Sequence, residues 1–274
     1  MNQFLGRSVR RLGRVARIVS GAVLRRLTPM DKASDVLATM RAFPVAEIDE
    51  LTGRGPLLVI TPHPDDESLG CGGVIAEART RGHTVRLVLV TDGAASHPGS
   101  RSHPPPILQR VREGELLAAA AVLGVPAECV DMLRLPDGQA PWRGRVFEDV
   151  ASRLSELVRT HAVATICTTW PRDPHTDHVA AFRLGRAAAR ATGAKLFLYP
   201  VWGWTLSARL WLPRAPIDGF RIDVSKQLAV KRAAIDCHRS QTGRLIDDDP
   251  SGFVLTPEFR ALFEQRYETF LRTV

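Results

Sequence analysis

The stretch Leu57-Leu-Val-Ile-Thr-Pro-His-Pro-Asp-Asp-Glu67 decides the fold of this chain. Its first part, residues 57–62, is apolar and partly β-branched and runs into a proline-rich turn, which predicts a short buried strand. Helical composition over residues 68–81, closed by Gly82, and a second apolar run at 84–91 follow. Together these segments predict a strand–helix–strand unit with a histidine and three acidic residues at the end of its first strand.

The same alternation continues along the chain. Further helices are predicted at 107–124, 146–160 and 178–192, and further strands at 129–135, 162–169 and 195–201. Strands alternating with helices form a mostly parallel sheet covered on both faces, so we predict an α/β, Rossmann-like fold. The C-terminal part is predicted to hold a strand at 220–224, a helix at 225–239, a solvated acidic loop at Asp247–Asp249 and a final helix from Pro257 to Leu271.

The positive charge of the chain is concentrated at one end. The chain has 274 residues and a net charge of +8, but residues 1–30 contain seven arginines and no acidic residue. Residues 31–274 are therefore nearly neutral, and a nucleic-acid groove on the folded body is excluded. We divide the chain into a basic N-terminal segment, residues 1–30, and one α/β domain, residues 31–274.

The basic segment leaves two interpretations open. Apolar residues recur in it at roughly helical spacing, which is typical of a helix lying on an anionic lipid surface. The alternative is a poorly ordered leader or a helix packed on the body. No run of 18 apolar residues occurs, so no spanning helix is predicted, and no secretory signal is evident. We expect a cytoplasmic protein, with peripheral contact at the inner membrane surface under the first interpretation.

A second polar motif, His175-Thr-Asp-His178, follows the strand predicted at 162–169. Ligands bind outside the carboxyl ends of the strands in sheets of this kind. The motif after residues 57–62 therefore lies at the same edge of the sheet as this one. We predict that the two motifs form a single site.

The residue types in the two motifs suit a hydrolytic metal site. A catalytic zinc ion needs three nitrogen or oxygen ligands and one open position, and His63, Asp66 and His178 form such a set. Asp65 and His175 remain beside the ion as a base for the attacking water and an acid for the leaving amine. One zinc ion is expected, although the ligands also suit another divalent metal.

Two further acidic residues of the motifs support less specific predictions. Asp177 is predicted to hydrogen-bond an imidazole and fix its tautomer. Glu67 is left open between a catalytic role and that of a carboxylate favoured at a helix N-terminus. The four cysteines lie far apart in the sequence, which excludes a cysteine-based zinc knuckle.

The first motif resembles the His-Pro-Asp-Asp-Glu signature of the LmbE-like, or PIG-L, N-acetylglucosaminyl deacetylases, and the second resembles their His-Pro-Asp-His signature. Thr176 stands where the family usually has proline. Further matches extend the resemblance over about residues 56–270. They are Thr91-Asp92-Gly93, Arg112-Glu113-Gly114-Glu115, Leu135-Pro136-Asp137-Gly138 and Lys231 through His238-Arg239-Ser240-Gln241.

The resemblance implies roles for individual residues. It makes His63, Asp66 and His178 the metal ligands, Asp65 the general base, His175 the electrophile or general acid, and Asp177 the residue that orients His175. Arg112 and Asp137 match positions that hold sugar hydroxyls, and Gln241 lies in a motif near the site. Alternatively, Arg112 pairs with a neighbouring glutamate, Asp137 belongs to a turn, and Gln241 ends its helix. His238 is placed outside the site.

We therefore predict a zinc-dependent hydrolase that removes an N-acetyl group from a small-molecule amino-sugar conjugate, such as an N-acetylglucosaminyl compound. Two alternatives stay open. One is an amidase acting on a larger N-acyl group or a thiol conjugate. The other is a non-catalytic, lipid-associated binding protein. The sequence carries no signal of an oligomeric state.

Overall fold

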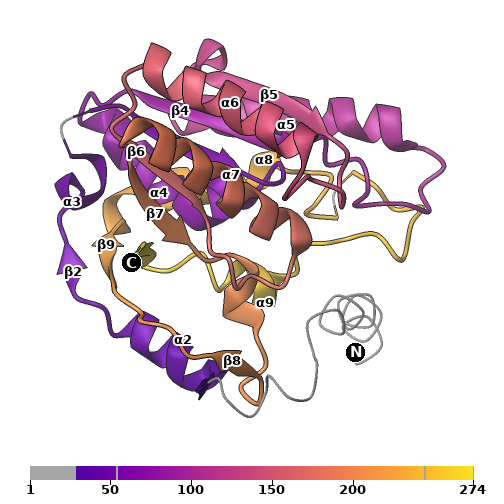
Figure 1. The fold of residues 1–274 in the computed structure, drawn as a ribbon. Coiled ribbons are helices and arrows are strands. Elements are labelled where there is room, and N and C mark those ends of the chain that lie inside the picture. The colour runs from indigo at the N-terminus through magenta and orange to yellow at the C-terminus, as the bar shows by residue number, and fades with distance from the viewer. Residues whose placement is uncertain (1–28, 54, 244, 274) are drawn as a thin grey trace.

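Figure 1 shows the chain in a computed structural model that describes residues 29–273 except 54 and 244. The basic N-terminal segment, residues 1–30, therefore lies almost wholly outside the described residues, and its two interpretations stay predictions. The elements follow in the order β1 (Met30–Lys32), α2 (Ala33–Arg41), β2 (Val45–Ala46), α3 (Asp49–Thr52), β3 (Leu57–Thr61), α4 (Asp66–Thr80), β4 (Val85–Thr91), α5 (Pro105–Val122), η2 (Ala127–Cys129), β5 (Val130–Leu135), α6 (Arg145–Thr160), β6 (Thr165–Thr169), α7 (Thr176–Thr192), β7 (Lys195–Tyr199), η3 (Trp202–Thr205), β8 (Trp211–Pro213), β9 (Gly219–Asp223), η4 (Ser225–Gln227), α8 (Leu228–Cys237), α9 (Pro257–Arg260) and β10 (Tyr267–Arg272).

The central sheet has eight strands in the order β2-β9-β10-β7-β6-β3-β4-β5. The five strands from β7 to β5 are parallel, whereas β10 is antiparallel to both of its neighbours. From β3 the chain moves outward to β4 and β5, then returns to β6 on the other side of β3. The predicted Rossmann-like, mostly parallel sheet is confirmed, and its strand order reverses between β3 and β6.

Strand β3 lies at the centre of two hydrophobic layers. Its four apolar residues have no exposed surface. Leu57 and Val59 pack into one core cluster, and Leu58 and Ile60 into the other. The sequence of β3 is an unbroken apolar run because a strand of a parallel sheet is covered on both faces.

The helices cover the two faces of this sheet. Helix α8 packs against both α4 and α5, and the residues of these helices share one core cluster. On the other face α6 lies against α7, as Figure 1 shows, and α2 contributes to the same second cluster. No helix within the described ranges combines the length and the apolar character needed to cross a bilayer.

The final helix predicted from Pro257 to Leu271 is wrong. Helix α9 ends at Arg260, and residues 267–272 form β10. Its inner residues are buried between β9 and β7, which supply hydrogen-bonding partners on both sides. Tyrosine, threonine and phenylalanine suit such a strand, and the tertiary environment decides between the two conformations.

Candidate active site

Strand β3 ends in a turn that brings His63 and Asp66 together. The Thr61 hydroxyl donates a hydrogen bond of 2.9 Å to the backbone oxygen of His63. One Asp66 oxygen, Oδ2, accepts from the His63 backbone nitrogen at 3.1 Å and lies 3.1 Å from the ring Nδ1. Between them, Asp65 has a φ of 132°, which is strained for a residue with a side chain. Strain of this kind persists where surrounding contacts hold it, as at active sites.

The loop between β6 and α7 supplies two more imidazoles. His175 caps the N-terminus of α7, and its Nδ1 accepts a hydrogen bond of 3.2 Å from the backbone nitrogen of Asp177. His178 is fully buried. The Thr169 hydroxyl donates to the His178 backbone oxygen, and the His178 Nδ1 lies 2.9 Å from Asp173 Oδ2. Backbone and ring are therefore both fixed in place.

Together the two loops form a cluster of three imidazoles. The ring centroids of His63 and His175 are 4.6 Å apart, and that of His178 lies 5.4 Å and 5.2 Å from them. One nitrogen from each ring falls within 4.8 Å of the others. Asp66 Oδ2 faces both His63 Nδ1 and, at 3.3 Å, His178 Nε2. Within the described residues this buried Nε2 has no partner in hydrogen-bond geometry, only the ion-pair contact with Asp66, so the donor atoms fit a divalent cation placed among them.

The outer nitrogen of His63 contacts two carboxylates. Its Nε2 lies 3.1 Å from Asp177 Oδ2 and 3.3 Å from Asp137 Oδ1. These three residues form a second group of donor atoms within 4.8 Å. The backbone nitrogens of Gly138 and Ala140 already donate to Asp177, which suits an outer partner that orients the ring. The family resemblance placed Asp177 on His175, but its carboxylate contacts His63, and only its backbone meets His175.

Carboxylates give this region a strong preference for positive charge. Burial lowers the pKa of His178, but the nearby Asp66 carboxylate outweighs it and the pKa rises to about 9. Burial also opposes protonation of His63, yet hydrogen bonds to Asp137 and Asp177 raise its pKa well above the usual value. His175 lacks such a partner, so burial and the charge of His63 lower its pKa to about 3. A cation is thus favoured where His63 and His178 converge.

Asp65 is held from one side by Arg112, which is 3% exposed. The guanidinium Nη2 donates to Asp65 Oδ2 at 3.2 Å and to the Pro64 oxygen at 2.7 Å, and Nη1 donates to the Gly93 oxygen at 2.9 Å. Gly93 has a φ of 66°, and a Cβ there would lie 2.9 Å from Arg112 Nη1, so only glycine fits. Burial raises the pKa of Asp65 to about 7, against the opposing charge of Arg112. Both terminal nitrogens of Arg112 therefore donate to the protein, whereas its buried Nε makes no hydrogen bond within the described residues.

Asp65 is held from the other side by a buried pair: Glu67, whose role the sequence left open, and His238, which we placed outside the site. Glu67 Oε2 accepts from the Asp65 backbone nitrogen at 3.0 Å, and Glu67 Oε1 lies 3.1 Å from His238 Nε2. Neither Glu67 nor His238 has exposed surface. Glu67 thus supports the strained backbone of Asp65. The position of His238 in a motif of the family resemblance was the available signal.

Asp173 is a second residue that the sequence did not single out. Its carboxylate accepts from the backbone nitrogens of Val201, Trp202 and Gly203 at 2.9, 3.1 and 2.7 Å, and it also contacts His178. A Cβ at Gly203 would lie 2.7 Å from this carboxylate, which explains the glycine. Asp173 therefore fixes the ring orientation of His178 from a rigid backbone cradle.

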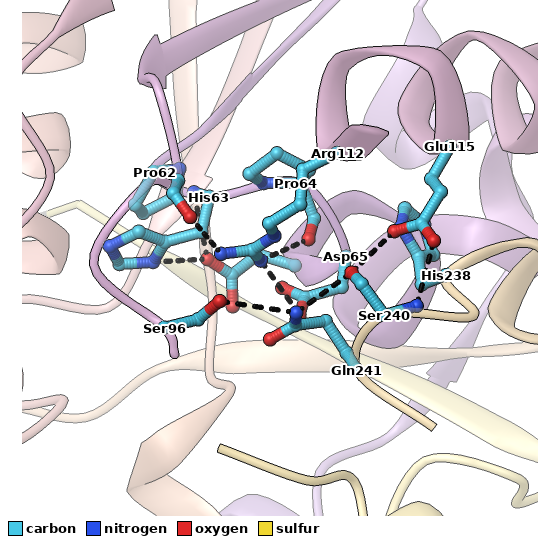
Figure 2. Close-up of polar contacts among 12 residues, drawn as sticks. Pro62, His63, Pro64, Asp65, Ser96, Arg112, Glu115, His238, Ser240 and Gln241 are labelled. Atoms are coloured by element: carbon cyan, nitrogen blue, oxygen red, sulfur yellow. Dashed lines mark hydrogen bonds and ion pairs between the residues drawn. The ribbon is translucent and has the colours of Figure 1, made fainter. Parts of the chain in front are cut away.

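Gln241 comes to the site from the segment after α8, as Figure 2 shows. Its Nε2 donates to the hydroxyls of Ser96 at 3.2 Å and Ser240 at 2.9 Å. Glu115 fixes Ser240 by accepting from its backbone nitrogen and its hydroxyl. The Gln241 Oε1 is buried and has no hydrogen-bond partner. Gln241 therefore keeps one acceptor free beside the turn that carries Asp65.

The acidic loop predicted at Asp247–Asp249 is also hydrogen-bonded to the loop after β4. Asp248 accepts from the Ser100 hydroxyl at 2.7 Å and from the backbone nitrogens of residues 101–102 at 2.8 Å. Asp249 accepts from the Gly99 backbone nitrogen at 2.7 Å. Asp247 and Asp248 are exposed, so the predicted solvated loop is confirmed. Its hydrogen bonds to the backbone amides of a distant loop are an addition that local sequence does not reveal.

The structure brings the predicted catalytic and metal-binding residues together. His63, Asp65 and Asp66 come from the turn after β3, and the other three come from the start of α7. Asp137 lies against His63, and Gln241 borders the turn. A cavity of about 350 Å³ opens elsewhere, near Arg41, and includes none of these residues. Side-chain chemistry, rather than concavity, therefore identifies the site.

Comparison with solved structures places the fold in a known class. An N,N'-diacetylchitobiose deacetylase from Pyrococcus horikoshii superposes with a TM-score of 0.61, covering 82% of this chain and 86% of that one, at 21% identity. The hydratase GalB from Pseudomonas putida KT2440 superposes with a TM-score of 0.55 over 69% of this chain and 81% of its own, also at 21% identity. The likeness establishes the α/β fold, which carries more than one reaction.

Sequence comparison then shows a family likeness over part of the chain. Residues 58–189 match the family model described as PIG-L, GlcNAc-PI de-N-acetylase. A 1D-myo-inositol 2-acetamido-2-deoxy-alpha-D-glucopyranoside deacetylase from Kineococcus radiotolerans is 29% identical over 189 residues, which cover 59% of this chain and 51% of the relative. The chain thus spans about half the length of that relative. The expected resemblance to the PIG-L, or LmbE-like, family is confirmed over residues 58–189.

Proposed function

We propose that this chain is a zinc-dependent N-deacetylase that acts on an amino-sugar glycoconjugate. Water and the N-acetyl group would yield the free amine and acetate. The observation that carries the proposal is the convergence of His63 Nδ1 and the unpartnered His178 Nε2 on one oxygen of Asp66. The names of the inositol-linked and diacetylchitobiose relatives support the amino-sugar class and the acetyl group.

His63, Asp66 and His178 are the proposed metal ligands. Each imidazole has its other nitrogen on a carboxylate, Asp177 for His63 and Asp173 for His178, which is the usual arrangement around metal-bound histidines. When bound there, zinc would act as a Lewis acid toward the acetyl carbonyl and the attacking water. The ligand set is His2Asp, in which the three protein ligands leave a position open for substrate.

Asp65 is the proposed general base. It adjoins the ligand Asp66, and Arg112 and Glu67 fix its carboxylate and backbone from opposite sides. This rigidity suits a group that must accept a proton from water in one geometry. Glu67 and Arg112 would then be positioning residues rather than groups that touch the substrate.

His175 is the proposed proton donor. Its Nδ1 accepts from the Asp177 backbone, so the neutral ring carries its proton on Nε2. From this nitrogen the neutral ring can donate a hydrogen bond to the oxyanion. It can protonate the departing amine only after it takes up a second proton, such as the one that Asp65 accepts from water. Gln241 Oε1 and the Asp137 carboxylate are the proposed acceptors for sugar hydroxyls. Arg112 would contribute to binding only indirectly, through its contacts with the turn at Asp65.

The test is a metal-supplemented screen of N-acetyl sugar conjugates, read as loss of one acetyl group by mass and as release of acetate. Asp65→Asn should lower kcat by about 10²–10⁴-fold while metal content stays unchanged. Asp149→Asn, on an exposed position of α6, is the matched control and should leave the rate unchanged. Full activity of Asp65→Asn would refute the mechanism. Hydrolysis of larger acyl groups alone would favour the amidase alternative, and hydrolysis of no amide would refute the proposed function.

A further inference from the structure

A two-stranded antiparallel ribbon, formed by β1 and β8, stands apart from the main sheet. In Figure 1 it lies beside α2 at the lower edge of the molecule, at the opposite end of the view from α5 and α6. Its register pairs Met30 with Pro213, Asp31 with Leu212, and Lys32 with Trp211. Side chains alternate between the two faces of a strand, so this register gives the ribbon two distinct faces.

The inward face of the ribbon belongs to the protein core. Leu212 is buried and joins the core cluster that contains α2 and α7. Asp31, the acidic residue of the ribbon, is on the same face and accepts from Arg214 at 2.9 Å. Leu212 therefore anchors the ribbon, and the acidic charge is neutralised within it.

The outward face is apolar and basic. Trp211 is 53% exposed, and the Lys32 Nζ lies 5.7 Å from its ring centroid. Pro213 is exposed on the same face, and Leu210, just before β8, is 42% exposed. A partly exposed tryptophan beside a lysine is typical of side chains that sit at the boundary between lipid and water.

The sequence around the ribbon is strongly depleted in acidic residues. Residues 1–30 lead into β1 and contain no aspartate or glutamate. Residues 178–217, which include β8, also contain none, and their basic residues are Arg183, Arg186, Arg190, Lys195, Arg209 and Arg214. The first stretch ends at Met30, which pairs with Pro213 of the second stretch on the outward face, whereas Asp31, the next residue, lies on the inward face. A partner for this face must therefore accept both positive charge and an inserted aromatic ring.

We propose that the outward face of the β1–β8 ribbon binds the surface of an anionic lipid bilayer. Trp211 and Leu210 would enter the headgroup region, and Lys32 and Arg209 would contact the anionic headgroups. A nucleic acid is the less suitable partner, because the centre of this face is apolar rather than a basic groove. The proposal does not depend on the deacetylase activity.

Co-sedimentation of the full chain with vesicles tests the proposal. Binding is expected to vesicles of phosphatidylcholine mixed with phosphatidylglycerol, and to be much weaker with phosphatidylcholine alone. Trp211→Ala should weaken binding about tenfold or more, because the apolar contact of the ring is lost. Lys32→Ala should weaken it about fivefold, the effect expected of one basic residue at an anionic surface.

Trp142→Ala is the matched control, since Trp142 is 43% exposed but lies between β5 and α6. It should bind vesicles as the wild type does. Leu212 is left intact in every variant so that the ribbon stays anchored. A melting temperature of each variant equal to that of the wild type verifies that the fold is unchanged. Binding of Trp211→Ala equal to that of the wild type would overturn the proposal, because residues outside the ribbon would then carry the attraction. Absence of vesicle binding, or preferential binding of duplex DNA, would overturn it as well.

Discussion

Replacing Asp173 by asparagine should weaken metal binding without removing any metal ligand. The Asp173 carboxylate accepts four hydrogen bonds, three from backbone nitrogens and one from the His178 ring. Oδ1 accepts from Gly203, and Oδ2 accepts from Val201, Trp202 and His178 Nδ1. An asparagine has one acceptor oxygen, so its NH2 group must face either the Gly203 amide or the other three donors. In either orientation at least one buried donor loses its partner, and the charge that favours the bound tautomer of His178 is lost.

The magnitude follows from these contacts. Loss of an outer partner of a metal-bound histidine usually costs about 10–100-fold in metal affinity. One buried donor left unpaired costs about 1–3 kcal/mol of folding stability. For a domain of this size each kcal/mol lowers the melting temperature by about 2–4 °C. Zinc affinity is measured by competition with a chromophoric chelator, and stability by thermal unfolding in excess chelator.

Glu268→Gln separates these two effects. Glu268 is also buried and also accepts from two backbone nitrogens, those of Gly73 and Val74, as well as from Lys231. It makes none of the hydrogen bonds of the imidazole cluster within the described ranges. This variant should lose stability as Asp173→Asn does but keep its zinc affinity. The reasoning would be refuted if Asp173→Asn bound zinc as tightly as the wild type, or if both variants lost affinity equally.

Three further outcomes are expected. Asp66→Ala should abolish the rise in melting temperature that added zinc produces. His175→Ala should retain that rise and lose hydrolysis. The reverse pattern would make His175 the ligand. Glu67→Gln should lower kcat and leave zinc content intact, because it loosens the backbone of the proposed base; an unchanged kcat would contradict this. Hydrogen bonds, chiefly from the Ser100 hydroxyl, hold the pKa of Asp248 below its ordinary value. The stability that these hydrogen bonds contribute is present above the ordinary carboxyl pKa and is lost only as pH falls through the lower pKa of the folded state. Hydrogen-exchange protection of the Arg101 amide, corrected for intrinsic rates, should therefore be equal at about pH 7 and pH 5. Loss of protection at pH 5, or its persistence in Asp248→Asn, would count against this role of the carboxylate.

The sequence by itself determined the five parallel strands of the sheet and the two motifs at the centre of the site. Strand β3 could be recognised because both of its faces are buried, which leaves an unbroken apolar run. The motifs that contain His63 and His178 could be placed at one edge because strand ends in a parallel sheet lie together. These inferences need only local pattern and the rules of chain topology.

Only the tertiary structure decided which buried polar groups meet. Glu67 and His238 are 171 residues apart in the sequence, and His63 and Asp177 are 114 apart. Whether such groups touch depends on how α8 and α7 pack against the sheet. The same holds for β10, whose conformation depends on strands far away in the chain. A buried polar group must find a partner, but its own sequence neighbourhood does not say which one.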